Sequence, residues 1–252
     1  MKNSPSPTTW VFIRGLTRGS FHWLDFHLRF KDAFKDIEVL IPELAGNGSL
    51  YEQISPQHLD DAVRQLRQKL SLGKNQKIGL FTISMGGMIG TRWAEMFPDE
   101  VSHLVLVNTS FSSLSPFYDR LKLGNYPQII KNFIIHNPEK MENFIMKATS
   151  NFEKNWRPHF EELVKYQKDH PISLTNFRRQ MKMSGEAFFE SKPQVQILVL
   201  ASLKDRLVSC RCSQAIAKKW QVPIEIHPSA GHDLPLDDCP WTLDQIRRWI
   251  RS

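Results

Sequence analysis

The chain has 252 residues, of which 41% are hydrophobic and 23% are charged, a composition typical of globular proteins. This length predicts one large domain, or one domain with an insertion, and the 16 Phe, 7 Trp and 4 Tyr exclude a mainly disordered chain. The net charge of +7 permits anionic partners, but the basic doublets lie in helical patterns rather than in one basic run, so we expect no nucleic-acid partner.

Membrane and targeting signals are missing from the sequence pattern. No run approaches the roughly 20 apolar residues that a membrane-spanning helix needs, so no membrane span is expected. The first residues, MKNSPSPTTW, are polar and rich in Pro, without the apolar core of a signal peptide. These patterns predict a cytoplasmic protein.

The cysteines and histidines indicate neither a disulfide framework nor a metal site. The three cysteines, Cys210, Cys212 and Cys239, are an odd number, and the first two are too close for a CxxC motif. We expect ordinary thiols, and we expect neither a metal ion nor an organic cofactor. The sequence carries no signal for an oligomeric state.

Short apolar runs alternate with longer amphipathic stretches along the chain. The apolar runs predict strands at Trp10–Ile13, Ile37–Ile41, Lys77–Ile83, Leu104–Asn108, Val195–Ala201 and Pro223–His227. The amphipathic stretches predict helices at Ser55–Leu70, Met85–Phe97, Cys212–Trp220 and Trp241–Arg251. Continuous β-branched runs are typical of strands buried on both faces. The alternation predicts an α/β fold, a doubly wound and mostly parallel sheet of about six or more strands with helices on both faces.

Residues 112–189 interrupt this alternation, because they contain no strand pattern. Helical patterns fill the interval, at Tyr126–Asn137, Pro138–Ser150, Arg157–His170 and Ser173–Phe189. The interval is too long for a loop, and it predicts a helical insertion over the ligand-binding ends of the strands, which is a lid. The alternative is a second packing layer without a function. The expected organisation is a core in two parts, 1–111 and 190–252, with the helical lid at 112–189.

The turn at Ser84 is the most informative motif. An apolar strand runs into Ser84, and a helix that begins with Met85, Gly86 and Gly87 follows at once. The two glycines allow a sharp turn, and the helix N-terminus next to the hydroxyl favours an anion. This pattern resembles G-x-S-x-G, the nucleophile elbow of the α/β-hydrolases, with Thr82 in place of the first Gly.

Two further candidate residues follow later strands. Asp205 comes a few residues after Val195–Ala201, and His232 lies in the segment A-G-H-D-L-P after the last strand. The order Ser, Asp, His is that of the α/β-hydrolases, and A-G-H-D-L-P resembles their histidine loop. The resemblance implies a catalytic triad of Ser84, Asp205 and His232.

Other roles compete for these positions. Asp205 could instead cap the helix that follows it, because Asp is a favoured N-cap residue. Asp233 and Asp237 are rival acids, since both are near His232 in sequence. We favour Asp205, because the side chain of a direct neighbour on a loop points elsewhere.

The loop after the first strand, Arg14-Gly15-Leu16, matches the place where the family forms its oxyanion hole. By resemblance, the backbone N–H groups of Leu16 and Met85 bind the oxyanion. Arg14 stands where family members often have His. It could pair with an acid beneath the loop or offer charge to an anionic substrate, and we favour the structural role.

The resemblance covers about Trp10–Ser110 and Gln194–Arg251, and the lid matches only in being helical. It implies a serine hydrolase of the carboxylesterase kind, which cleaves a small or medium apolar carboxylic ester through an acyl-enzyme intermediate. The nucleophile is Ser, which disfavours a dehalogenase that uses a carboxylate. The alternatives are a thioester hydrolase, a carbon–carbon bond hydrolase or a lyase with the same triad, and a ligand receptor with low turnover.

Overall fold

The computed structural model describes residues 6–73 and 76–251. Its six strands form one sheet in the order β2-β1-β3-β4-β5-β6, in which all neighbouring strands are parallel. The strands are β1 (Thr9–Ile13), β2 (Glu38–Leu40), β3 (Ile78–Ile83), β4 (Val101–Val107), β5 (Gln196–Ser202) and β6 (Ile224–His227). All six predicted strands are present, and the prediction of a doubly wound parallel sheet is confirmed.

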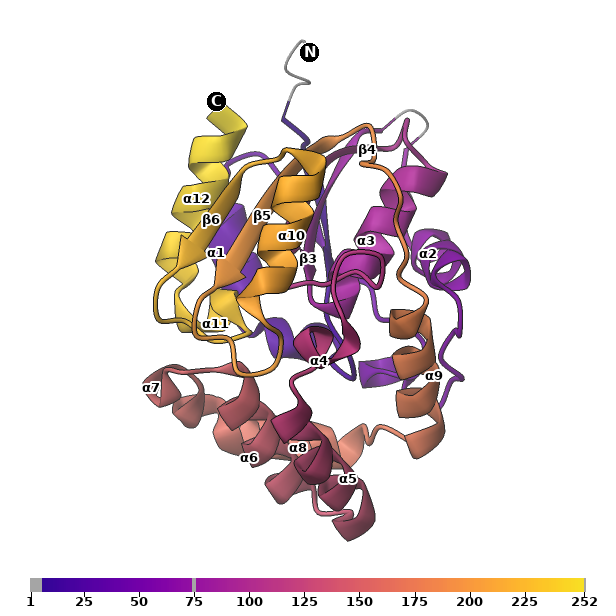
Figure 1. The fold of residues 1–252 in the computed structure, drawn as a ribbon, viewed down its shortest axis with the longest axis vertical. Helices are drawn as coiled ribbons and strands as arrows, with labels where there is room; N and C mark the ends of the chain where they lie inside the picture. The colour runs from indigo at the N-terminus through magenta and orange to yellow at the C-terminus, as the bar shows by residue number, and fades with distance from the viewer. Residues whose placement is uncertain (1–5, 74–75, 252) are drawn as a thin grey trace.

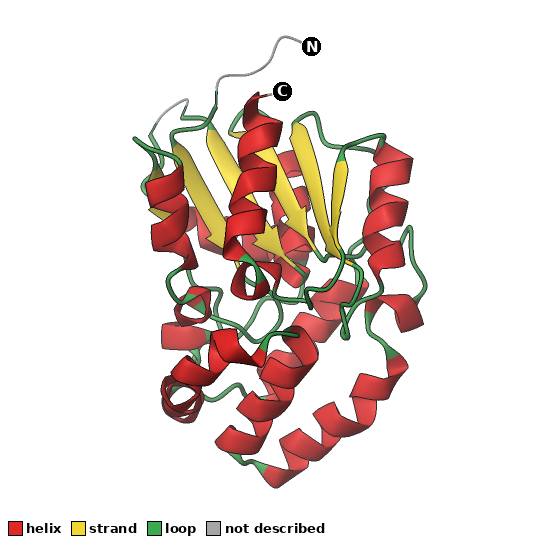
Figure 2. Ribbon diagram, turned by 90° about the vertical axis from the view of Figure 1, so that its left-hand side faces the viewer, coloured by secondary structure: helices red, strands yellow, loops and turns green. Residues whose placement is uncertain are grey.

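Side chains of the strands alternate between two buried layers, one on each face of the sheet. Leu80 packs in one layer, with residues of α2 (Leu59–Gln68), α3 (Met85–Met96) and α10 (Cys210–Trp220). Its neighbour Phe81 packs in the other layer, with residues of α1 (Phe26–Ala33) and α12 (Cys239–Arg251). Figure 2 shows the sheet between helices in front of it and behind it. This arrangement explains why the strand sequences are apolar at successive positions.

The strand order places a crevice next to β1. The chain continues from β1 to the edge strand β2 on one side, and then returns to β3 on the other side of β1. Loops that leave β1 and β3 therefore diverge, and such a switch point is where open α/β sheets bind ligands. The loop after β1 and the turn after β3 are the two segments in which the sequence predicts the oxyanion hole and the nucleophile.

The segment between β4 and β5 is helical, as the sequence predicts. It contains α4 (Phe117–Arg120), α5 (Tyr126–Ile135), α6 (Pro138–Thr149), α7 (Glu153–Trp156), α8 (Phe160–Asp169) and α9 (Leu174–Gly185), with 3-10 turns at Leu123–Asn125 and Arg157–His159. Local sequence explains where these helices begin: Pro138 is the first residue of α6, and the Asn137 side chain accepts a hydrogen bond from the amide of Lys140 at 2.9 Å. The strand arrows point toward these helices (Figures 1 and 2), which we call the helical insertion.

Several short elements were not predicted. They are α1, α4, α7, α11 (Leu234–Asp237), and the 3-10 turns at Ser20–Trp23, Gly48–Leu50 and Leu123–Asn125. Each is eight residues or shorter, so its side chains give too few turns for a helical period to show. Among the helices of residues 6–73 and 76–251, none combines the length and apolar character needed to cross a membrane.

Candidate active site

Ser84 occupies a strained turn between β3 and α3. Its φ of 56° and ψ of −121° are rare for a residue with a side chain, and such a conformation costs on the order of 1–3 kcal/mol. Gly86 allows α3 to begin against the end of β1, because a Cβ at this position would lie 2.2 Å from the carbonyl oxygen of Ile13. The hydroxyl of Thr109 donates a hydrogen bond to the Ser84 carbonyl at 2.6 Å. The surrounding backbone therefore holds the turn in place.

Thr82, which departs from the nucleophile-elbow motif, is accommodated by Gly90 of α3. The Thr82 side chain is fully buried, and its hydroxyl donates to the carbonyl of Val105 at 2.7 Å. A Cβ at position 90 would lie only 2.7 Å from the Thr82 methyl carbon. Gly90 on α3 thus leaves room for the Thr82 methyl group, which a glycine at position 82 would not have.

This packing predicts that Gly90→Ala lowers the free energy of unfolding by about 1–2 kcal/mol, because the added methyl group overpacks the Thr82 methyl. Thr82→Ser removes that methyl and keeps the hydroxyl. When Gly90→Ala is made in the Thr82→Ser background, it should therefore not lower the free energy of unfolding, since Ala is the better helix former. Urea unfolding of the four proteins measures the coupling. If Gly90→Ala lowers the free energy of unfolding equally in the wild-type protein and in Thr82→Ser, the two side chains do not share this space.

Asp205 and His232 are in direct contact at the ends of β5 and β6. Nδ1 of His232 lies 2.7 Å from Oδ2 of Asp205, and the two residues are 5% and 2% exposed. The second carboxylate oxygen accepts hydrogen bonds from the amides of Leu207 at 2.7 Å and Val208 at 2.9 Å. A carboxylate at Nδ1 keeps the proton on that nitrogen and leaves Nε2 free to accept another.

The rival acids have other partners. Asp233 forms an ion pair with Arg14, and Asp237 accepts hydrogen bonds from the amides of Gly231 at 2.6 Å and Asn151 at 2.9 Å. Burial raises the pKa of Asp237, and these hydrogen bonds oppose that effect. The N-cap position of α10 is held by Ser209 rather than Asp205. The geometry therefore pairs His232 with Asp205.

The loop after β1 approaches Ser84 closely. A Cβ at Gly15 would lie 3.0 Å from Cβ of Ser84, so a larger residue would push the loop away from the turn. Leu16, the next residue, lines the same cavity as Ser84. Met85 is the first residue of α3, where a backbone N–H has no acceptor within the helix. Both predicted oxyanion amides thus belong to segments next to Ser84.

Asn108, which the sequence analysis did not single out, holds the histidine loop against the sheet. It follows β4 with a φ of 46°, and its Nδ2 donates to the carbonyl of His232 at 2.8 Å. Its Oδ1 accepts the amide of Ser202 at 2.8 Å. The available signal was a polar residue at the end of the predicted apolar strand Leu104–Asn108.

Ser84 and His232 open into a cavity of about 100 Å³. The helical insertion supplies most of its apolar lining, including Ile129, Phe133, Phe144, Ile145 and Phe177. This volume is well above the roughly 10–15 Å³ that a cavity needs to hold one water molecule. The arrangement suits the small apolar part of a ligand whose reacting atom lies at Ser84.

Polar contacts join the helical insertion to the loop after β1, in addition to the stacking of Phe21 on Tyr166 of α8. Arg18 and Glu142 of α6 form a buried ion pair at 2.7 Å, with side chains 7% and 0% exposed. The amide of Thr17 donates to the side-chain oxygen of Gln180 of α9 at 2.9 Å. These contacts make the position of the loop that carries Leu16 depend on the insertion, and they were not predicted.

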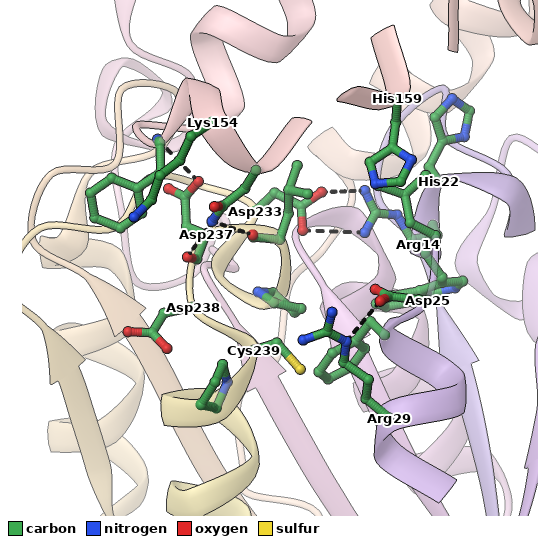
Figure 3. Close-up of a pocket in the computed structure, with 18 residues that line it drawn as sticks. Arg14, His22, Asp25, Arg29, Lys154, His159, Asp233, Asp237, Asp238 and Cys239 are labelled. Atoms are coloured by element: carbon green, nitrogen blue, oxygen red, sulfur yellow. Dashed lines mark hydrogen bonds and ion pairs between the residues drawn. The ribbon is translucent and has the colours of Figure 1, made fainter. Parts of the chain in front are cut away.

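A second, more polar cavity lies on the other side of Arg14 and Asp233. Its volume is about 460 Å³, and the Arg14–Asp233 ion pair lines both this cavity and the one at Ser84. Figure 3 shows the paired side chains pointing toward each other among the residues that line this second cavity. Within the described part of the chain, no group of three or more His, Cys, Asp or Glu residues could hold a metal ion.

Comparisons with solved structures give the same fold at low sequence identity. One match is 2-hydroxy-6-oxo-6-phenylhexa-2,4-dienoate hydrolase from Rhodococcus sp. strain RHA1, with 17% identity, a TM-score of 0.73, and coverage of 99% of this chain and 92% of that one. A thermophilic esterase from Thermogutta terrifontis has 18% identity, a TM-score of 0.67, and coverage of 98% and 91%. The type II thioesterase of the borrelidin biosynthetic cluster has 16% identity, a TM-score of 0.66, and coverage of 98% and 94%.

A search of curated proteins found no match. A family model described as the alpha/beta hydrolase family matches residues 10–243, which is nearly the whole chain. The match includes both parts of the sheet and the helical insertion between them. The protein therefore belongs to the α/β-hydrolase family.

Proposed function

We propose that the protein is a serine hydrolase that cleaves small or medium apolar carboxylic esters through an acyl-enzyme intermediate. The observation that carries this proposal is the convergence of Ser84, on its strained turn, with the buried His232–Asp205 pair at one apolar cavity. Nucleophile, base and orienting acid in this order along the chain are what such chemistry needs.

In the proposed reaction, Ser84 Oγ attacks the ester carbonyl carbon while His232 Nε2 takes the hydroxyl proton. Asp205 holds the imidazole and stabilises its charged form. The backbone amides of Leu16 and Met85 bind the tetrahedral oxyanion, each worth on the order of 3 kcal/mol of the barrier. His232 then protonates the leaving alcohol, and a water molecule cleaves the acyl-enzyme by the same steps.

An uncharged substrate fits the proposed site best. The cavity wall from the helical insertion is apolar, which supports the lid role that we propose for residues 112–189. Arg14 and Arg18 line the cavity, but each is paired with a carboxylate. Their charges are balanced and are not directed at a ligand anion.

The limited cavity predicts a maximum in the dependence of kcat/KM on acyl length. Each methylene that fits the cavity should contribute up to about 0.8 kcal/mol, or about fourfold in kcat/KM, and longer chains should lose activity once the cavity is full. A series of nitrophenyl esters of graded acyl length measures this profile. An activity that keeps rising to long-chain lipids would indicate an open groove instead.

Two of the similar structures make other reactions worth testing, because their names describe a thioesterase and a hydrolase of a phenylhexadienoate. Measuring kcat/KM separates these reactions. The substrates are an oxyester, a thioester and a compound cleaved at a carbon–carbon bond, all with the same acyl part. We expect the oxyester to react fastest. A receptor with low turnover would be labelled by a fluorophosphonate at one serine but would not hydrolyse any of the three substrates repeatedly.

A further inference from the structure

Arg14 and Asp233 form a buried, two-point ion pair. The distances are 2.6 Å from Nη2 of Arg14 to Oδ2 of Asp233 and 3.4 Å from Nη1 to Oδ1, and the side chains are 8% and 5% exposed. The guanidinium group also lies 4.6 Å over the ring of Trp23. A planar cation held by a carboxylate and an aromatic face has little freedom to move.

The pair connects the two loops on which the proposed reaction depends. Arg14 lies two residues before Leu16, whose amide is proposed to bind the oxyanion, and Asp233 directly follows His232. The amide of Asp233 also donates to the carbonyl of Thr149 of α6 at 2.7 Å, which holds the histidine loop from the other side. A shift of either loop would change the distance between the oxyanion site and the base.

We propose that the Arg14–Asp233 ion pair is a positioning element of the active site. It holds the loop after β1 and the histidine loop at a fixed separation, and it keeps the charge beside His232 balanced. This inference rests on the proposed serine hydrolase function. Neither residue exchanges a proton with the substrate, so both are positioning residues. The transition state needs the two loops at a fixed separation, since misplacement of a catalytic group by about 1 Å is costly.

Other charged groups around His232 have partners of their own. Asp205 contacts its Nδ1, and the Lys122 amine donates to the carbonyl oxygen of Asp205. On the neighbouring helix α11, Asp237 is engaged by backbone amides and is only 5% exposed.

Across the cavity, Arg18 is neutralised by Glu142. His22, in the loop after β1, has a pKa well below its ordinary value because of burial and then the charges of Arg18 and Arg14, so it is neutral. Removing one member of the Arg14–Asp233 pair would therefore leave one new, unbalanced charge near the catalytic imidazole.

Single substitutions should move the acidic limb of the pH–rate profile in opposite directions. In Arg14→Gln, the unpaired carboxylate stabilises the imidazolium ion, so the limb of kcat/KM should move to higher pH by about half a unit. In Asp233→Asn, the unpaired guanidinium destabilises that ion, and the limb should move to lower pH by a similar amount. At the pH optimum, kcat should fall about tenfold in each variant with little change in KM.

The double variant Arg14→Gln/Asp233→Asn leaves no buried unpaired charge, which protects folding if a single variant does not express. Its acidic limb should return to the wild-type position while kcat stays low. Arg14→Lys keeps the charge but not the two-point geometry. Its acidic limb should stay at the wild-type pH, and its kcat should lie between those of Arg14→Gln and the wild-type protein. Arg92→Gln, which breaks the ion pairs of Arg92 with Asp60 on α2 and with Glu95, is the control and should change neither quantity.

If the limbs of both single variants stay at the wild-type pH and kcat is unchanged, the pair has a structural role only and the inference is wrong. This outcome is distinct from failure of the proposed function. Wild-type protein that is not labelled by a fluorophosphonate at Ser84 would overturn the serine hydrolase itself. Labelled wild-type protein with unmoved limbs in the variants would overturn only the positioning role.

Discussion

Replacing Ser84 with Ala is expected to lower kcat/KM for the best ester substrate by at least ~10³-fold while the protein stays folded. The substitution removes the only atom that forms the proposed acyl bond, and the residual rate would come from the oxyanion amides and substrate binding. The turn should persist, because Thr109 and Gly86 hold its backbone and neither contact uses the Ser84 hydroxyl. Steady-state kinetics with the substrate of optimal acyl length measures the loss, and circular dichroism checks the fold.

Ser110 provides the matched control for this experiment. It lies three residues after the end of β4, at the same edge of the sheet, and it is 1% exposed. Ser110→Ala should retain most of the activity. If Ser84→Ala retains most of it instead, the assignment of the nucleophile is wrong.

Asp205→Asn is expected to lower kcat by up to ~10⁴-fold with little change in the structure. The amide can keep the hydrogen bonds from Leu207 and Val208 through its oxygen. Its NH₂ group would then face Nδ1 of His232, which favours the tautomer with the proton on Nε2. In this tautomer, His232 cannot accept the proton of Ser84, so the base is lost while the side chains stay in place.

Asp233→Asn is the comparison that decides between the two acids. Asp233 is next to His232 in sequence but pairs with Arg14. Asp233→Asn should therefore lower kcat about tenfold through positioning, far less than Asp205→Asn does. Both variants are measured with the same ester at the pH optimum of each. A larger loss at Asp233 than at Asp205 would reverse the assignment of the acid.

The sheet could be predicted because its strands are buried on both faces and therefore appear as continuous apolar runs. The beginning of β4 was missed, since the strand begins at Val101 and the polar residues Ser102 and His103 interrupt the apolar pattern. Both are buried: the Ser102 hydroxyl donates to the carbonyl of Ile78 at 3.1 Å, and burial lowers the pKa of His103 to about 4. Polar residues that are satisfied inside the core cannot be distinguished from loop residues by pattern alone.

The three proposed catalytic residues could be proposed from sequence because each follows a strand of a parallel sheet, whose carboxyl ends share one edge. The ion pairs around them could be predicted only in part, since the sequence led us to expect an acid beside Arg14 but did not identify which one. Arg14 and Asp233 are 219 residues apart, and Arg18 and Glu142 are 124 apart. Which carboxylate meets which arginine depends on how the loop after β1 packs against the histidine loop and the helical insertion. The sequence offers many pairs of opposite charge and no local signal that selects between them.

Mapping the adduct of a fluorophosphonate probe tests the central claim most directly, because the probe reacts only with a serine activated by a neighbouring base. Intact mass and peptide analysis should show one adduct per chain, on the peptide that contains Ser84. The adduct should be absent in Ser84→Ala and form much more slowly in His232→Gln. An adduct on another serine such as Ser110 or Ser202, or labelling of Ser84 at an unchanged rate without His232, would contradict the proposed active site.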